Sequence, residues 1–499
     1  MSETLVLGII IGYFVLLFVI SQITGRKANE ETFFTADRNS PWYVVAFGMI
    51  GASLSGVTFI SVPGAVGNGA WGYMQIVFGY LLGYAVIALV LLPLYYRLNL
   101  TSIYGYLRQR FGEASYRTGA AFFLLSRIIG ASLRMYLVVL VLDLAIGRAL
   151  GIPFWGMVLI SIALIFIYTF RGGIKTVVWT DTLQTFCMLL GAGITVCLIG
   201  QELDLSAGGM MSMIAESDYS KVFFWDWGPG NNFFKQFFSG AFIAIVMTGL
   251  DQDMMQKNLT CRSLGDAQKN VYTFSVVLIF ANLLFLSLGA LLYLYGTQTG
   301  IVELVFMEDC AIRIADPDTG EMICHKTDEL FPLLSLNYLG PVAGIVFILG
   351  VIAAAYSSAD SALTALTTSF CVDILDFEEK TDADWKKQTR YLVHIGFSIL
   401  LFIVILIFKW MNDDAVIWAV FDAAGYTYGP LLGLYAFGLF TQIKVKDQWV
   451  PVVCVLSPIL VYLIQMYSPV WFGYSFGFEK LILNGLLTMG GLWLLRETR

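Results

Sequence analysis

Long apolar segments recur from one end of this chain to the other, and each is long enough to cross a membrane as a helix. Hydrophobic residues make up 58% of the sequence and charged residues only 13%, whereas soluble domains carry about 25% charged residues. Because lipid cannot satisfy backbone hydrogen bonds, such segments favour helices. They predict an all-α membrane protein with about 13 transmembrane helices. The expected ranges are 5–24, 43–67, 72–96, 117–147, 154–170, 177–200, 233–257, 271–297, 338–375, 389–410, 415–440, 449–467 and 477–495.

Basic residues predict the orientation of these helices. The first segment lacks the basic leader and small-residue cleavage site of a signal peptide, so it is expected to remain as a helix. Lys and Arg concentrate in alternate loops, for example at Arg108, Arg110, Lys386 and Lys387. Such loops are cytoplasmic, which places the N-terminus outside, the C-terminus in the cytoplasm and Lys257 in a cytoplasmic loop. We expect a multi-pass protein of the inner (cytoplasmic) membrane, surrounded by lipid and without a nucleic-acid partner.

Two of the segments are interrupted. Glycines and Pro63 crowd the segment at 43–67, and Thr248 and Gly249 precede two acids in the segment at 233–257. Each interrupted segment opens a set of five, and an odd number of crossings makes the two sets inverted repeats around a midplane site. The expected organisation is a leading helix and loop (1–42), a first five-helix repeat (43–200), an outer loop (201–232), a second repeat (233–440) and two peripheral helices (441–499).

Residues 350–369 carry hydroxyl side chains and one acid inside an apolar segment. Ser357, Ser358 and Ser361 share one helical face with Ala354, and Asp360 lies one turn beyond Ser357. A dehydrated sodium ion needs such oxygen ligands, and an ionisable residue at this depth indicates a functional site. The alternative is that the hydroxyls only allow two helices to pack closely.

Three further charged residues lie within or at the ends of apolar segments. Arg127 and Arg134 flank Gly130 on one face of the segment at 117–147. Buried arginines pair with an acid or with an anionic ligand, and the candidate acids are Asp143, Asp422 and Asp251. Asp181 opens the segment at 177–200, where it could cap a helix or reach a cation held by the serines.

The long polar loops at 201–232 and 299–331 are expected to be solvated caps on the outer side. Cys310 and Cys324 share the second loop, where a disulfide and two free thiols are equally compatible with the sequence. The seven cysteines form no CxxC pair, which argues against a metal cluster. No nucleophile–base pair is visible either, so we expect no catalytic residues and no enzyme.

Three stretches carry a resemblance to a known family. GGIKTVVWTDTLQ, DQDMMQKNLTCRSLGDAQK and AAAYSSADSALT are similar, in the same order, to motifs of the sodium/solute symporter family, which includes bacterial sodium/galactose and sodium/sialic acid transporters. The resemblance covers nearly the whole chain. It implies a LeuT-type core of inverted five-helix repeats, sodium-coupled symport by alternating access, and function as a monomer.

The resemblance also implies two sodium sites. The first would use carbonyl oxygens of Gly51, Leu54 and Ala354 with the hydroxyls of Ser357 and Ser358. Some members hold a second sodium ion with an aspartate and three serines. Here the matching residues are Asp181, Ser357, Asp360 and Ser361, so an aspartate stands where the family has a serine.

The expected solute is a small polar molecule, with a slight preference for an anion or a sugar acid such as sialic acid. In sialic acid transporters an arginine takes the carboxylate, and its position here is Gly130, with Arg127 and Arg134 one turn away on either side. A neutral sugar is the alternative, as is a solute sensor that does not transport. The candidate solute-binding residues are Ser55, Thr58, Asn68, Gln75, Arg127, Arg134, Thr248 and Asp251.

Overall fold

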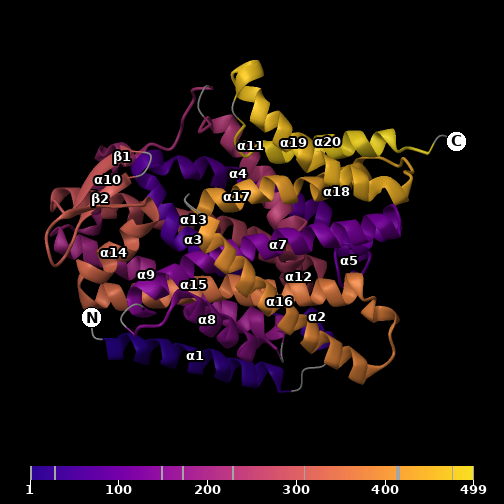
Figure 1. The fold of residues 1–499 in the computed structure, drawn as a ribbon, viewed down its shortest axis with the longest axis horizontal. Coiled ribbons are helices and arrows are strands. Elements are labelled where there is room, and N and C mark those ends of the chain that lie inside the picture. The colour runs from indigo at the N-terminus through magenta and orange to yellow at the C-terminus, as the bar shows by residue number, and fades with distance from the viewer. Residues whose placement is uncertain are drawn as a thin grey trace.

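The computed structural model describes residues 3–26, 30–147, 150–170, 173–227, 230–307, 310–411, 416–474 and 476–497. Gly172, in one of the quoted motifs, and residue 415, at the start of an expected helix, lie outside these ranges. The described residues form a helical bundle with a small sheet at one end (Figure 1). The elements are α1 (Glu3–Gly25), α2 (Glu30–Thr35), α3 (Trp42–Gly69), α4 (Tyr73–Val86), α5 (Leu92–Arg97), α6 (Gly105–Arg110), α7 (Glu113–Leu142), α8 (Phe154–Thr169), α9 (Gly173–Glu202), α10 (Ala207–Glu216), α11 (Phe233–Ala244), α12 (Gln252–Leu259), α13 (Leu264–Gln298), β1 (Val302–Met307), β2 (Cys310–Ala315), β3 (Met322–His325), α14 (Leu330–Asn337), α15 (Gly340–Ser369), α16 (Ala383–Met411), α17 (Val416–Thr427), α18 (Gly429–Phe440), α19 (Val450–Phe472) and α20 (Lys480–Leu494).

Both interrupted segments are broken in the structure. Ser55 in α3 has φ 53° and ψ 175°, a conformation outside the helical region. Helix α11 continues into a π-helical turn, Ile245–Gly249, and α12 then leaves it at an angle of 64°. Glycine-rich sequence and the π turn explain why the breaks occur at these points. The breaks expose backbone groups in the middle of the bundle.

Helix α15 forms the core of the bundle, where it runs between α3, α7 and α9 (Figure 1). All residues from 350 to 369 are buried. A π-helical turn, Phe370–Ile374, extends α15, and the short helix α14 precedes it. Helix α15 and this turn together cover nearly all of the long expected segment at 338–375, and α14 ends just before it begins.

Length and composition qualify eight helices of the described chain as membrane spans, or nine if the bent pair α11–α12 is counted as one. One of the eight covers Trp42–Arg97, 56 residues, which is longer than a single crossing needs. Shorter apolar helices cover Phe154–Thr169, Gly429–Phe440 and Lys480–Leu494. These findings establish a multi-pass helical protein, while the count of 13 crossings and the orientation stay predictions.

The chain is predominantly helical, as expected, but the loop at 299–331 holds a small sheet that the sequence analysis did not predict. Strands β1, β2 and β3 form an antiparallel sheet there, and a disulfide joins Cys310 to Cys324. Alternating side chains explain the strands, because Ile312 and Ile314 point into the protein while their neighbours are partly exposed. The sheet and the start of α1 lie at one end of the bundle, and α20 runs toward the other (Figure 1).

The segment at 415–440 is also divided, which the sequence analysis did not anticipate. Helix α17 ends at Thr427 and α18 begins at Gly429, with Pro430 in its first turn. Proline cannot continue the preceding helix, so it ends α17 and begins α18. Tyr428, between the two helices, donates a hydrogen bond to Asp251 over 2.5 Å.

Candidate functional site: a cavity between two broken helices

A cavity of about 80 Å³ lies where the two breaks meet. The broken part of α3 contributes Ser53, Leu54 and Ser55, and the π turn before α12 contributes Met247 and Thr248. Tyrosines of α4, both arginines of α7, Thr58 of α3 and Asn282 of α13 also contribute to the polar lining. The site therefore combines free backbone groups, hydroxyls and positive charge in the centre of the bundle.

Five of the expected solute residues line this cavity: Ser55, Thr58, Arg127, Arg134 and Thr248. The other three expected residues, Asn68, Gln75 and Asp251, do not line the cavity, and their local contacts or positions show why.

Asn68 is exposed near the end of α3. Gln75 holds a loop, since its Nε2 donates to the carbonyl of Asn231 over 2.9 Å and its Oε1 accepts from the amide of Phe224 over 3.1 Å. Asp251 caps α12 by accepting hydrogen bonds from the amides of Asp253 and Met254. Asn68 therefore lies at the surface, Gln75 stabilises a loop, and Asp251 caps a helix.

The two arginines differ in their partners. Arg127 is almost fully buried, forms an ion pair with Asp253 and lies 3.8 Å from Asp251. This matches the interpretation of an internal ion pair with Asp251, whereas Asp422 pairs with Lys480 instead. Arg134 is half-buried at the cavity, and within the described part of the chain no acid lies within ion-pair distance of it. Arg134 is thus the positive charge that the cavity leaves open to a ligand.

Asp253 belongs to this network and was not among the predicted residues. It also accepts a hydrogen bond from Ser361 of α15 over 3.1 Å. All eight residues of α12 are buried, and Gln252 bonds the amide of Ile103 and the carbonyl of Thr101. Helix α12 therefore closes the cavity on one side. Two acids directly after the break were the only sequence signal for this role.

The residues expected at the first sodium site lie on α3 and α15, two helices that pack against each other. Gly51 and Leu54 lie just before the break at Ser55, and they are buried together with Ala354, Ser357 and Ser358. The amide of Gly51 donates to Thr185 of α9 over 3.0 Å. The hydroxyl of Ser358 is buried and has no hydrogen-bond partner among the described residues. Buried hydroxyls are normally bonded, so this one marks a place where an oxygen ligand is available.

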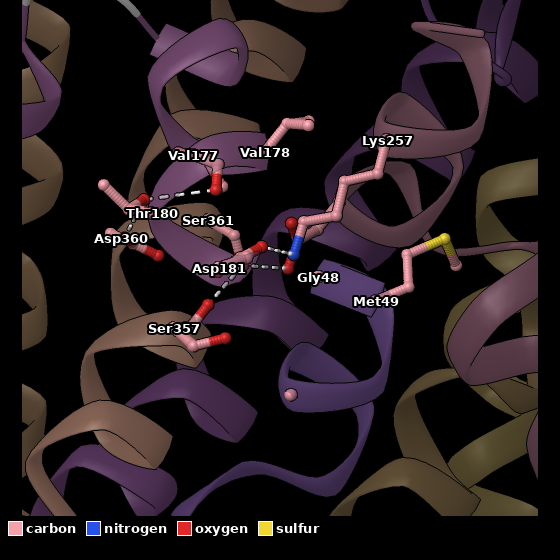
Figure 2. A network of polar contacts seen from close by, with 12 residues as sticks. Gly48, Met49, Val177, Val178, Thr180, Asp181, Lys257, Ser357, Asp360 and Ser361 are labelled. Carbon is pink, nitrogen blue, oxygen red and sulfur yellow. Dashed lines mark hydrogen bonds and ion pairs between the residues drawn. The ribbon is translucent and has the colours of Figure 1, made fainter. Parts of the chain in front are cut away.

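The residues expected at the second sodium site are divided between different partners. Asp181 forms an ion pair with Lys257, whose Nζ lies 2.7 Å from Oδ2, and Ser357 of α15 lies beside this carboxylate (Figure 2). Asp360 has different partners, since it accepts hydrogen bonds from Tyr168 over 2.9 Å and from Thr180 over 3.4 Å (Figure 2).

The sequence analysis placed Lys257 in a cytoplasmic loop because it follows an apolar segment. In the structure Lys257 is instead buried in the bundle. Its side chain is 1% exposed, because α12 turns back into the bundle after the break. Hydropathy alone cannot distinguish such a buried turn from a loop.

Comparisons with known proteins identify the family to which this arrangement belongs. The family model described as "Sodium:solute symporter family" matches residues 33–446. The chain belongs to this family. This symporter is thus a multi-pass membrane transporter with Na⁺ as its coupling ion, and not an enzyme.

Relatives of this symporter include the sodium/sialic acid symporter NanT of Aliivibrio fischeri, 25% identical over 427 residues, or 84% of this chain and 79% of that protein. The human sodium/iodide cotransporter is 25% identical over 424 residues, 83% of this chain and 62% of that protein. Among solved structures, a substrate-bound outward-open Na⁺-coupled sialic acid symporter matches with a TM-score of 0.79 at 21% identity, covering 98% of this chain and 97% of that chain. This symporter therefore has the LeuT-type fold.

Proposed function

We propose that this symporter carries a small organic anion whose carboxylate is bound by Arg134. The main observation is that Arg134 lines the cavity and has no acidic partner among the residues that the structure describes, whereas Arg127 beside it is neutralised by Asp251 and Asp253. A guanidinium in a partly dehydrated site binds a carboxylate through paired hydrogen bonds. The two relatives named above transport sialic acid and iodide by their names, and both solutes are anions.

The size of the cavity bears on which anion fits. It encloses about 80 Å³, whereas pockets for drug-sized ligands enclose about 300–1,000 Å³. A sugar acid such as sialic acid would require the cavity to widen, and a smaller carboxylate would not. Ser55, Thr58 and Thr248 would supply hydrogen bonds to hydroxyl groups of either solute.

Sodium would bind beside the cavity, at the carbonyl oxygens of Gly51, Leu54 and Ala354 and the hydroxyls of Ser357 and Ser358. The hydroxyl of Ser358, which has no hydrogen-bond partner in the described ranges, and the break at Ser55 support this placement. Leu54 also lines the solute cavity, so the same residue of α3 would contact both the sodium ion and the solute. Solute and ion would then each raise the affinity of the other by the same factor.

Transport would proceed by alternating access between the two five-helix repeats, 43–200 and 233–440. We place the end with the sheet and the disulfide outside the cell, since disulfides persist in oxidising compartments. The N-terminus would then be outside and the C-terminus cytoplasmic, with about 13 crossings of the inner membrane. In this orientation α12 closes the cytoplasmic side. The proposal includes a monomer as the functional unit, with lipid as its surroundings.

Uptake into proteoliposomes tests the proposal. Radiolabelled sialic acid, lactate and galactose serve as probes, each with an inward gradient of Na⁺ or of K⁺. We expect Na⁺-dependent uptake of at least one acid and none of galactose. Arg134→Gln should raise the KM for that acid about tenfold or more, since a charged hydrogen bond contributes roughly 1.5–3 kcal/mol.

Asn68→Ala provides the matched control, because Asn68 lies away from the cavity and should not affect uptake. Uptake of galactose that survives Arg134→Gln would establish the neutral-sugar alternative. Solute-dependent thermal stabilisation without counterflow would indicate a sensor. Uptake that is equal in Na⁺ and K⁺ would contradict the sodium site.

A further inference from the structure

Lys257 carries a positive charge into the interior of the bundle. Its Nζ lies 2.7 Å from Oδ2 of Asp181, and each of the two side chains is 1% exposed. The lysine comes from α12 and the aspartate from α9, so the pair joins two segments that are far apart in sequence. An unpaired charge at this depth would be strongly unfavourable, and each group therefore depends on the other.

The pair lies next to the proposed sodium site. Ser357 of α15 lies beside the Asp181 carboxylate (Figure 2), and Thr185, one turn along α9, accepts a hydrogen bond from the amide of Gly51. Gly48 is close as well, since an added Cβ there would lie 3.0 Å from Cβ of Asp181. The carboxylate that pairs with Lys257 therefore lies beside Ser357, which is one of the ligands proposed for sodium.

We propose that the Lys257 ammonium permanently fills the cation position at Asp181, so that this symporter binds one sodium ion and not two. The inference rests on the proposed function, because it assigns the ion stoichiometry of that site. Within the described residues, Asp181 has Lys257 as its cationic partner. Asp360 accepts hydrogen bonds from Tyr168 and Thr180 through Oδ2, and Ser361 donates its hydroxyl hydrogen to Asp253, so each of these residues is bonded to a partner other than Asp181.

Electrostatics explains why a second sodium ion would be excluded. Two unit charges about 4 Å apart repel strongly where the effective dielectric constant is low. At an effective dielectric constant near 20, that repulsion lowers affinity on the order of a hundredfold or more. The single negative charge of Asp181 is already balanced by the lysine. A sodium ion at the first site instead meets carbonyl and hydroxyl oxygens that carry no formal charge.

Equilibrium binding of radiolabelled sodium to the purified full-length protein tests the inference without requiring the solute. The wild-type protein should bind one ion per chain at saturation. Lys257→Met keeps the length of the side chain and removes its charge, so Asp181 becomes available and the count should rise to two. The double variant Asp181→Asn, Lys257→Met is the matched control and should return to one.

Two ions per wild-type chain would overturn the inference, and so would a Lys257→Met variant that still binds only one. If Lys257→Met does not fold, the wild-type count decides alone. The proposed function fails in a different way, through a wild-type protein that binds no sodium at all. In the otherwise wild-type protein, Ser358→Ala should weaken binding of the single sodium ion about tenfold or more, which would assign that ion to the first site.

Discussion

The hydroxyl of Ser361 donates a hydrogen bond to Oδ2 of Asp253 over 3.1 Å. The same carboxylate pairs with Arg127 of α7, so one acid of α12 connects α15 to α7, the helix that carries the proposed solute ligand Arg134. Every group in this connection is buried. A movement of α12 during transport would therefore change contacts with both α15 and α7.

Asp253→Asn should destabilise the protein by about 3 kcal/mol, because it leaves the buried Arg127 with only the more distant Asp251. Chemical unfolding in detergent measures this change. Glu303→Gln is the control, since the Glu303–Arg313 pair is largely exposed and should contribute less than about 1 kcal/mol. Equal effects of the two substitutions would show that burial does not increase the contribution of the Arg127–Asp253 pair to stability. The double variant Arg127→Met, Asp253→Asn should recover part of the loss.

Ser358→Ala should weaken the sodium dependence of uptake about tenfold or more while leaving the stability of the sodium-free protein nearly unchanged. Within the described part of the chain the serine hydroxyl has no hydrogen-bond partner to lose, so its removal should affect mainly the ion. Sodium titrations of solute uptake and of thermal stability measure the two effects. Thr364→Ala on the same helix is the control, because its hydroxyl bonds the backbone carbonyl of Asp360. A matching loss in both variants would argue against a ligand role for Ser358.

Replacing Ser55 tests the strained break in α3. Its φ of 53° is favourable for glycine and unfavourable for β-branched residues. Ser55→Gly should therefore keep or slightly raise stability, whereas Ser55→Val should lower it by about 1–2 kcal/mol. Thermal unfolding compares the two. If valine is accepted as easily as glycine, α3 is not broken at this residue in solution.

The Cys310–Cys324 disulfide provides a test of orientation. In intact cells, a membrane-impermeant maleimide should label these two cysteines only after treatment with an impermeant reductant. A Cys310→Ser, Cys324→Ser variant is the control for labelling elsewhere, including the exposed Cys197. Labelling that requires permeabilised cells would place the sheet in the cytoplasm and reverse the proposed topology.

Local sequence signals predicted the parts of this fold that depend on neighbouring residues. Glycine-rich stretches marked both broken helices, and the spacing of Ser357, Ser358 and Ser361 placed them on a buried helix. The family motifs identified the family and its fold.

Contacts between distant segments could not be predicted in this way. The Asp181–Lys257 pair depends on the 64° turn that carries α12 back into the bundle, and no local signal gives the direction of a chain after a break. The small sheet was missed for a related reason, because its strands are short and lie in a polar loop. The assignment of Arg127 to an internal pair needed the position of Asp253, which only the folded chain supplies.

Gly51 and Thr185 approach so closely that a methyl group on Gly51 would collide with the threonine hydroxyl. The two positions are thus a single steric unit that spans two helices. A lineage could therefore acquire alanine at 51 only after residue 185 had become smaller. Across descendants of a common ancestor, alanine at position 51 should occur only together with a residue smaller than threonine at position 185.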